Sequence, residues 1–467
     1  MGEGLTLLQS HYQQVSPGWQ SDSIESSCGN TFVSMVTASL QSATRMRPEV
    51  SKKGAFAFGT LLLFSVLYFA RPEDVIPGMG YIPVAKISGG LAILGLIFGV
   101  GSRFSLKKLP IELRLLMALF VWECLTVPFA WYKGGAFGYV TAKCSKTVIL
   151  AILIAMVVTS MQRLRKLMYV QAAAVAAMTF ASVILYRGGR MGGVLGGVFD
   201  NPNDLAINIG MNWPLCLMFL LRTRNPFKKL IWGVGMLFLI RGLMLTYSRT
   251  GFLALGVASI FCVYEFGVRE KRRYLIAIAV VGVLMAAFFA PSGYGERVGS
   301  IFGKPLDVGD SQDARRELLI ESLKITAAHP LLGLGPGNFA SYTQTWRVTH
   351  NTYTELTSEC GIPALIIFLF ILRAAFRNLK RVRESRLFAE DPEVRLFTGG
   401  LWASLAGYVV GAFFASTAYQ LFPYFLVAYT TALFNIASGS GQKVQPGKSP
   451  LQTWTPNPQL VKVTNPS

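Results

Sequence analysis

Long apolar runs recur along most of the chain, and each is long enough to cross a membrane, which takes about 20 mostly apolar residues. The runs lie near 54–70, 83–100, 113–131, 147–161, 167–186, 204–221, 230–245, 252–266, 274–290, 353–372, 400–416 and 424–438. A soluble helix would alternate apolar and charged faces, whereas 275–290 carries no charge on any face. The pattern predicts an all-α polytopic membrane protein with about twelve transmembrane helices.

Composition agrees with this prediction, and the charge distribution adds an orientation. The chain is 52% hydrophobic and 15% charged, against roughly a quarter charged in soluble domains. Its net charge is +20, and the basic residues gather in alternate connections. The members of these clusters are Arg103, Lys107 and Lys108; Arg163, Arg165 and Lys166; Arg222, Arg224, Lys228 and Lys229; Arg269, Lys271, Arg272 and Arg273; and Arg377, Lys380, Arg381, Arg383 and Arg386. The positive-inside rule predicts that they and both termini are cytoplasmic.

The remaining connections are then expected to face outward: 71–81, 187–203, 246–251 and the long polar loop 291–352. Short basic clusters between helices are what orientation alone requires, so no nucleic-acid partner is expected. Residues 1–53 have no signal-peptide pattern and are predicted to form a disordered cytoplasmic tail. We expect the same for 439–467, with the transmembrane domain at 54–438. The scattered cysteines suggest neither a zinc site nor a disulfide framework.

The first outward loop combines arginines with glycines and a helix-starting sequence. Arg187 and Arg190 precede a glycine-rich stretch, which the sequence FDNPND follows at 199–204. Glycines let a backbone approach a ligand closely, and a capped helix start favours a nearby anion. Asn201 and Asn203 are therefore candidate binding residues. The alternative is a flexible turn that leads into a capped helix.

The second outward connection is a very short turn, YSRTG at 247–251. An arginine at the hydrocarbon boundary is unfavourable unless it snorkels or pairs. The planar fork of Arg249 suits bidentate contact with phosphate. The alternative is that Arg249 is a plain interfacial anchor.

The long loop 291–352 carries three features. Arg315 opens an amphipathic stretch with Leu319, Ile320, Leu323 and Ile325, which is expected to form a helix on the membrane surface. A turn-rich segment, PLLGLGPGNF at 330–339, follows and includes Asn338. The loop ends at His350 and Asn351, immediately before an apolar run.

His350 is one of only three histidines, with His11 and His329, and the only one at the mouth of a predicted span. A histidine can act as a base near neutral pH, although a lone histidine is often a structural group. Glu355 and Glu359, which share a helix face, are the alternative bases. Aspartates at 307, 310 and 313 are expected to be solvated, so no metal site is predicted.

Together these stretches resemble the O-antigen ligase and O-antigen polymerase superfamily of bacterial glycan-transferring membrane proteins. The resemblance rests on SRTG at 248–251, PLLGLGPGNF at 330–339, and HN at 350–351 with Glu359 and Gly361 leading into a span. The loop from Arg190 to Asn203 fits less specifically. The chain departs from the family at 363–364, where it has Pro-Ala and the family often has a second glycine.

The resemblance implies transfer of a glycan from an undecaprenyl-diphosphate carrier to an acceptor hydroxyl at the periplasmic face of the bacterial inner membrane. The acceptor is lipid A core, a glycan or a protein. The implied fold is similar to the large polytopic (GT-C-like) glycosyltransferases, with membrane lipids as neighbours and without cofactor, nucleotide sugar or essential metal. The resemblance assigns Arg249 and Arg190 to the diphosphate and His350 to the acceptor hydroxyl. The substrate-binding candidates are Arg187, Asn201, Asn203, Arg315, Asn338, Asn351 and Glu359.

Elementary chemistry agrees with these roles. Breaking the sugar–phosphate bond leaves negative charge that fixed guanidinium groups stabilise, and the acceptor hydroxyl must lose a proton. A transporter or flippase of lipid-linked glycans is the main alternative, and Arg241 and Glu123 are the charged residues in or near spans that it would use. A peptidoglycan-type polymerase would share the donor but not the sequence around His350.

Overall fold

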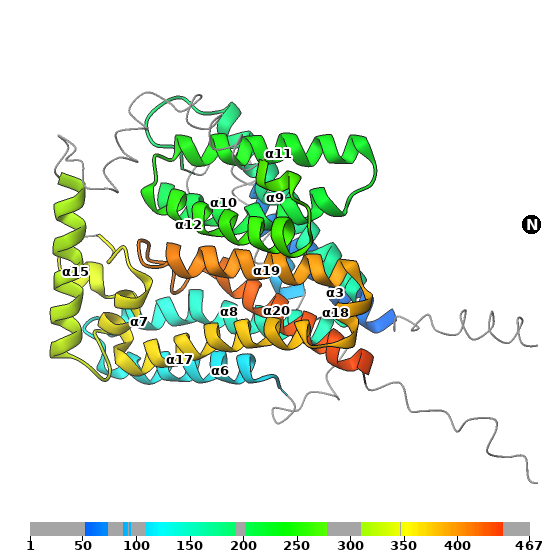
Figure 1. The fold of residues 1–467 in the computed structure, drawn as a ribbon. Helices are drawn as coiled ribbons and strands as arrows, with labels where there is room; N and C mark the ends of the chain where they lie inside the picture. Colours follow the sequence, from blue (N-terminus) through cyan, green and yellow to red (C-terminus); the bar gives the residue numbers. More distant parts are fainter. Residues whose placement is uncertain are drawn as a thin grey trace, which may run out of the picture. The chain divides into compact units, whose positions relative to one another are not determined.

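The computed structural model describes residues 52–72, 87–91, 93–94, 109–192, 201–277, 310–345 and 347–441. The chain divides into two units, Met1–Lys52 and Lys53–Ser467, and apart from Lys52 the helices described here belong to the second. All regular secondary structure in the described residues is helical (Figure 1). The predicted tails fall almost entirely outside these residues.

The helices follow one another along the chain with short connections. The first group is α3 (Lys52–Ala70), α6 (Ile111–Thr126), η4 (Val127–Phe129), α7 (Lys133–Tyr139), η5 (Val140–Cys144), α8 (Ser145–Val157), α9 (Met161–Ile184) and α10 (Pro202–Arg222). The second group is α11 (Pro226–Leu245), α12 (Arg249–Cys262), η7 (Val263–Arg269), α15 (Asp310–Ala328), α16 (Phe339–Tyr342), α17 (Thr352–Arg383), α18 (Arg386–Glu390), α19 (Pro392–Gly411) and α20 (Leu421–Gly441).

Six segments in the described residues are long and apolar enough to cross a membrane. They are Lys133–Val157, Met161–Ile184, Pro202–Arg222, Arg249–Arg269, Thr352–Arg383 and Leu421–Gly439. The chain is therefore a polytopic, all-helical membrane protein, as the hydropathy pattern predicted. The predicted spans 83–100 and 274–290 fall largely outside the described residues, so the count of twelve stays a prediction.

One predicted span has a different start. The pattern predicted a span at 147–161, whereas the helix runs continuously from Lys133 through the π-helix η5 to Val157. The apolar run is interrupted by glycines at 134, 135 and 138 and by the charge of Lys143. The hydropathy pattern therefore did not identify the first turns of this helix.

Side-chain caps define where three of the helices begin. The Asn201 side chain accepts a hydrogen bond from the Asn203 amide at the start of α10. Ser248 caps α12 through the Gly251 amide, and Asn351 caps α17 through the amides of residues 353 and 354. Each cap satisfies backbone donors that a helix start leaves without partners.

Small residues let α10, α12 and α19 pack closely together. A Cβ added to Gly251 of α12 would overlap the Cβ of Ala206 in α10. A Cβ added to Gly407 of α19 would lie 2.9 Å from the carbonyl oxygen of Ala254 in α12. Small residues at such contacts are typical of helix packing in membranes. The glycine of SRTG thus brings the first turns of α10 and α12 side by side.

Helix α15 crosses the ends of the neighbouring helices, whereas α17 and α6 run along the bundle (Figure 1). Leu318 and Ile325 of α15 are buried in a small cluster with Leu334 and Phe339. The predicted amphipathic helix is therefore present. Leu319, Ile320 and Leu323 are exposed, and the placement of this helix on the membrane surface stays a prediction.

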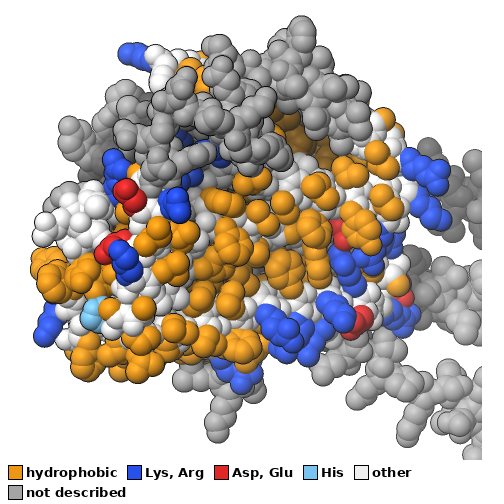
Figure 2. Space-filling model, turned by 60° about the vertical axis from the view of Figure 1, so that its left-hand side comes forward, with side chains coloured by type: hydrophobic (Ala, Val, Ile, Leu, Met, Phe, Trp, Pro, Cys, Tyr) orange, Lys and Arg blue, Asp and Glu red, His pale blue; other side chains and the backbone are white. Residues whose placement is uncertain are grey.

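The surface of the described helices is largely apolar, and Figure 2 shows hydrophobic side chains spread widely over one face. Large side chains point outward from helices that can span a membrane: Ile260 is 69% exposed and Phe370 is 52% exposed. In water such a surface would be unfavourable, whereas lipid tails are suitable neighbours for it.

Candidate active site

Arg190 is fixed by contacts to two other segments, the end of α11 and the start of α10. Its Nε donates to the carbonyl oxygen of Thr246 at 3.1 Å, and its Nη2 donates to Oδ1 of Asn203 at 3.2 Å. The Ser248 hydroxyl donates to the same Asn203 oxygen at 2.8 Å. Asn203 therefore joins the Arg190 loop to the turn before Arg249, and it orients a guanidinium rather than standing alone as a ligand.

Arg249 is the first residue of α12, half-buried, directly after a strained turn. Tyr247 has φ of 50°, a left-handed conformation that side chains other than glycine rarely adopt. The Ser248 side chain then accepts from the Gly251 amide at 3.3 Å. These constraints set the direction in which Arg249 leaves the helix start.

His350 also has a left-handed backbone, with φ of 55°. Asn351 follows as the cap of α17, and its Oδ1 accepts from the Tyr353 amide at 2.9 Å. Uncommon backbone geometry that the surroundings enforce often marks a functional site. Here it occurs just before Arg249 and at His350, the two residues that the sequence singled out most strongly.

The electrostatics show that these segments converge. Burial, together with Arg249 and Arg190, lowers the pKa of Arg315 from 12.5 to about 10. Burial, together with Arg315, Arg190 and Arg347, lowers the pKa of His350 from 6.5 to about 4. Arg190, Arg249, Arg315 and His350 come from four separate segments. Arg315 lies in the electrostatic field of Arg249 and Arg190, and His350 lies in that of Arg315 and Arg190. We call these four residues the arginine–histidine cluster.

The turn-rich segment 330–338 packs against a break in α17. Gly361 has φ of 81°, outside the helical range, and Pro363 follows it. The carbonyl of Glu359 has no helical donor, because residue 363 is a proline without an N–H group. The Gly335 amide donates to that carbonyl at 2.7 Å, and the Leu334 amide donates to the Ser358 carbonyl at 2.9 Å. The Pro-Ala departure from the family is thus accommodated by the loop itself.

The Glu359 carboxylate holds this loop directly. It is buried, and its oxygens accept from the Gly337 amide at 2.7 Å and the Phe339 amide at 3.1 Å. Asn338 is also buried, and its Nδ2 donates to the carbonyls of Leu334 at 2.9 Å and Tyr132 at 3.3 Å. In this structure both side chains shape the loop, and a direct role in substrate binding stays a prediction for each.

Positive φ angles explain the glycines of the same segment. Gly333, Gly335 and Gly337 have φ of 64°, 92° and 74°. A Cβ on Gly333 would overlap the Glu359 backbone, and a Cβ on Gly361 would overlap the Leu331 carbonyl oxygen. The glycine spacing of the motif therefore reflects close approach between loop and helix.

The connection 412–420 between α19 and α20 is an element that the sequence did not single out. Thr250 donates to the Phe414 carbonyl at 3.1 Å, and Thr352 donates to the Ala415 carbonyl at 2.7 Å. It thereby joins the first turns of α12 and α17, which follow Arg249 and His350. It contains no charged residue, so composition gave no signal that it makes these contacts.

The other predicted binding residues lie around the cluster in different ways. Asn201 and Asn351 cap helices, as described above. Arg187 is exposed, and no described contact connects it with the cluster. Among the described residues, no group of three or more metal-ligating side chains lies close together. The roles of all these residues stay predictions.

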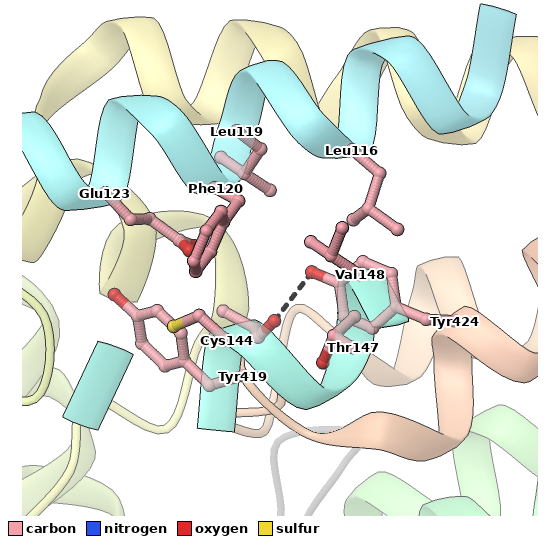
Figure 3. A pocket seen from close by; sticks show the side chains of 10 residues that line it. Leu116, Leu119, Phe120, Glu123, Cys144, Thr147, Val148, Tyr419 and Tyr424 are labelled. Atoms are coloured by element: carbon pink, nitrogen blue, oxygen red, sulfur yellow. Dashed lines mark hydrogen bonds between the residues drawn. The ribbon is translucent and has the colours of Figure 1, made fainter. Parts of the chain in front are cut away.

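A small cavity lies deeper in the bundle (Figure 3). Its volume of about 10 Å³ is close to the minimum needed for one water molecule. Glu123 of α6, Cys144 of η5 and Tyr419 point toward one another at one side of it, and Tyr424 donates to the Ala418 carbonyl at 2.7 Å. A cavity of this size cannot hold a sugar, so it is not the substrate site.

Fold and site together define a multi-pass helical membrane protein with a cationic site at one end of its helices. Residues 234–369 match the family model for O-antigen ligase. The match confirms the predicted resemblance to the O-antigen ligase and polymerase superfamily, and it includes Arg249, Arg315 and His350. It points to glycosyltransferase-like activity in polysaccharide biosynthesis. No curated protein was found to match the chain.

Proposed function

We propose that the chain transfers a glycan from an undecaprenyl-diphosphate carrier to an acceptor hydroxyl at the periplasmic face of the bacterial inner membrane. The observation that carries this proposal is the arginine–histidine cluster: three guanidinium groups and one imidazole, drawn from four segments, meet at one end of the helices. The O-antigen ligase family implies a lipid-linked glycan donor and a glycan or lipid A acceptor in general.

Arg190, Arg249 and Arg315 are proposed to bind the donor diphosphate. Desolvation by burial, and then repulsion from Arg249 and Arg190, disfavours the positive charge of Arg315 in the empty cluster, as the lowered pKa of Arg315 indicates. A diphosphate relieves this repulsion and gains charge-assisted hydrogen bonds from the guanidinium forks. As the sugar–phosphate bond breaks, the same groups stabilise the charge that develops on the leaving diphosphate.

His350 is proposed to act on the acceptor. Its lowered pKa keeps the imidazole neutral at pH 7, so that a ring nitrogen can accept the hydroxyl proton. The acceptor oxygen forms the new bond to the anomeric carbon, and the carrier diphosphate leaves with the electron pair of the broken bond. The imidazolium then returns its proton to the diphosphate or to water. The step needs neither nucleotide nor, as proposed, a metal.

The transporter alternative has less support in the geometry. Arg241 is exposed on α11 and does not face the interior, and Glu123 lies beside a cavity too small for a glycan. The ionisable groups that do converge lie at the helix starts near one end of the bundle.

The test is transfer by purified protein in nanodiscs, supplied with lipid-linked glycan and acceptor membranes from cells that lack the protein. We expect a new glycosidic bond in the presence of a chelator and without nucleoside triphosphate. His350→Ala should yield no product, whereas His329→Ala, at an exposed histidine, serves as the matched control. Product that requires nucleotide or metal would contradict this mechanism. Glycan movement across liposomes without a new bond would favour the transporter.

A further inference from the structure

The exposed side of α17 is apolar in the middle of the helix. Three large side chains lie there within about one turn of one another: Ile366, Leu369 and Phe370. They are 48%, 46% and 52% exposed. Because α17 is long and apolar enough to cross a membrane, lipid tails are suitable neighbours for these side chains.

The same side of the helix becomes basic directly after Phe370. Arg373, Arg377 and Lys380 follow at intervals of four and three residues, and all three are exposed. Residues at these intervals share one face of a helix, and Arg373 lies about one turn beyond Leu369. The basic side chains therefore continue the apolar side toward the end of α17, and we call them the basic stripe of α17.

Other arginines near this end of α17, which lies beside α18 (Figure 1), have carboxylate partners. The nitrogen–oxygen distances are 2.6 Å for Arg383 with Glu265, 3.0 Å for Arg222 with Glu393 and 3.4 Å for Arg395 with Glu270. By contrast, no described carboxylate forms an ion pair with the basic stripe. This includes Glu384, which is exposed just beyond the stripe.

The spacing of the basic stripe makes its members repel one another. Like charges three or four residues apart on a helix are destabilising, and here the described part of the protein supplies no carboxylate to offset them. Arg373 and Lys380 are separated by about 10 Å along the helix axis. Two guanidinium forks and one ammonium over this length provide enough donors for two phosphate groups.

We propose that this side of α17 binds an anionic phospholipid that carries two phosphate groups. The phosphates contact the basic stripe, and the acyl chains lie along Ile366, Leu369 and Phe370. Orientation in the membrane requires basic residues at one end of a span, but it does not require three of them to share one face without carboxylate partners. The adjoining apolar side favours a lipid over a soluble anion, since a soluble anion would contact the basic stripe alone.

This inference goes beyond the proposed glycan transfer and does not depend on it. The arginine–histidine cluster includes His350, which lies just before the first residue of α17, whereas the basic stripe lies in its last turns. A lipid bound at the stripe would therefore leave the proposed diphosphate site open.

The experiment measures lipid binding to the full chain by native mass spectrometry from detergent. The probes are cardiolipin with two phosphates, phosphatidylglycerol with one, and phosphatidylcholine with no net charge. The variants are Arg373→Gln, Arg377→Gln and Lys380→Gln, singly and combined. The matched control combines Arg224→Gln, Lys228→Gln and Lys229→Gln, which remove the same number of exposed positive charges around the start of α11.

We expect the wild type to bind cardiolipin more tightly than phosphatidylglycerol, and phosphatidylcholine weakest. Each single substitution should weaken cardiolipin binding about fivefold and the triple about a hundredfold, whereas the control should bind like the wild type. Thermal unfolding checks that each variant is folded, and the single variants decide the result if the triple variant does not fold.

Three results would overturn the proposal. An equal loss of affinity in the control would show a general effect of charge. Equal affinities of the wild type for cardiolipin and phosphatidylglycerol would exclude recognition of two phosphates. Release of bound cardiolipin by inorganic pyrophosphate at matched concentration would assign the basic stripe to a soluble anion.

Discussion

The pKa of His350 should depend on whether a ligand is bound to the neighbouring arginines. In the empty site, burial and three arginines hold its pKa at about 4. A bound diphosphate would offset the arginine charges, so the imidazolium would be less disfavoured and the pKa would rise. The residue would then become a stronger base when the donor is in place, which couples donor binding to activation of the acceptor.

This coupling predicts the pH dependence of the reaction. A base is active when deprotonated, so for the free enzyme kcat/KM for the donor should stay level as pH falls, until about pH 4. For the donor complex, kcat should begin to fall at a higher pH. Arg315→Gln removes one positive neighbour and should move the kcat/KM limb to higher pH, whereas Arg316→Gln, at an exposed position, should not. An acid limb of kcat/KM near pH 6.5 in the wild type would contradict the account.

Residue types and outward placement were enough to select Arg190, Arg249 and His350 from the sequence. The contacts that orient them were not predictable, because they join residues far apart in the chain. Asn203 binds Ser248, 45 residues away, and Arg190 binds Thr246, 56 residues away. The sequence also could not show that Glu359 holds backbone amides, since that depends on a loop that folds against it.

At the scale of elements, the glycine-rich loop and the break in α17 act as one unit. Gly333→Ala should destabilise the protein, because the left-handed conformation alone opposes a side chain by about 1–3 kcal/mol and a Cβ would overlap the Glu359 backbone. Gly233→Ala in α11, where a Cβ meets nothing within 4 Å, should be neutral or stabilising by up to about 1 kcal/mol. Thermal unfolding of both variants in detergent tests this, and equal stabilities would refute the close packing.

Hydropathy predicted most of the helices because a membrane-spanning helix has to be apolar along its whole length. Hydropathy did not predict the segments whose structure depends on features other than apolar composition. Helices α7 and η5 contain glycines and two lysines, so the start of their span was not recognised. The connection 412–420 has no charged side chains, and its importance lies in backbone carbonyls that accept from Thr250 and Thr352. Composition carries no information about such backbone contacts.

For the whole molecule, the distribution of basic residues predicts the orientation in the membrane. His350 and Ser385 flank opposite ends of α17, which is 32 residues long and apolar enough to cross the bilayer. Reporter fusions at Gly309 and Ser385 should therefore give opposite signals, periplasmic at the first and cytoplasmic at the second. Matching signals would refute the proposed topology.

The central claim is that arginines bind the donor and that His350 serves the acceptor. The most direct measurement is donor affinity and turnover for Arg249→Lys and His350→Ala in nanodiscs, with Arg241→Lys and His329→Ala as controls at exposed positions. Lysine keeps the charge of Arg249 but loses the paired donors, so Arg249→Lys should weaken donor binding and remove most activity. His350→Ala should abolish turnover and leave donor affinity largely intact. Full activity in Arg249→Lys would contradict the account and reduce Arg249 to an interfacial anchor. Normal turnover in His350→Ala would contradict it as well and leave Glu355 or Glu359 as the candidate base.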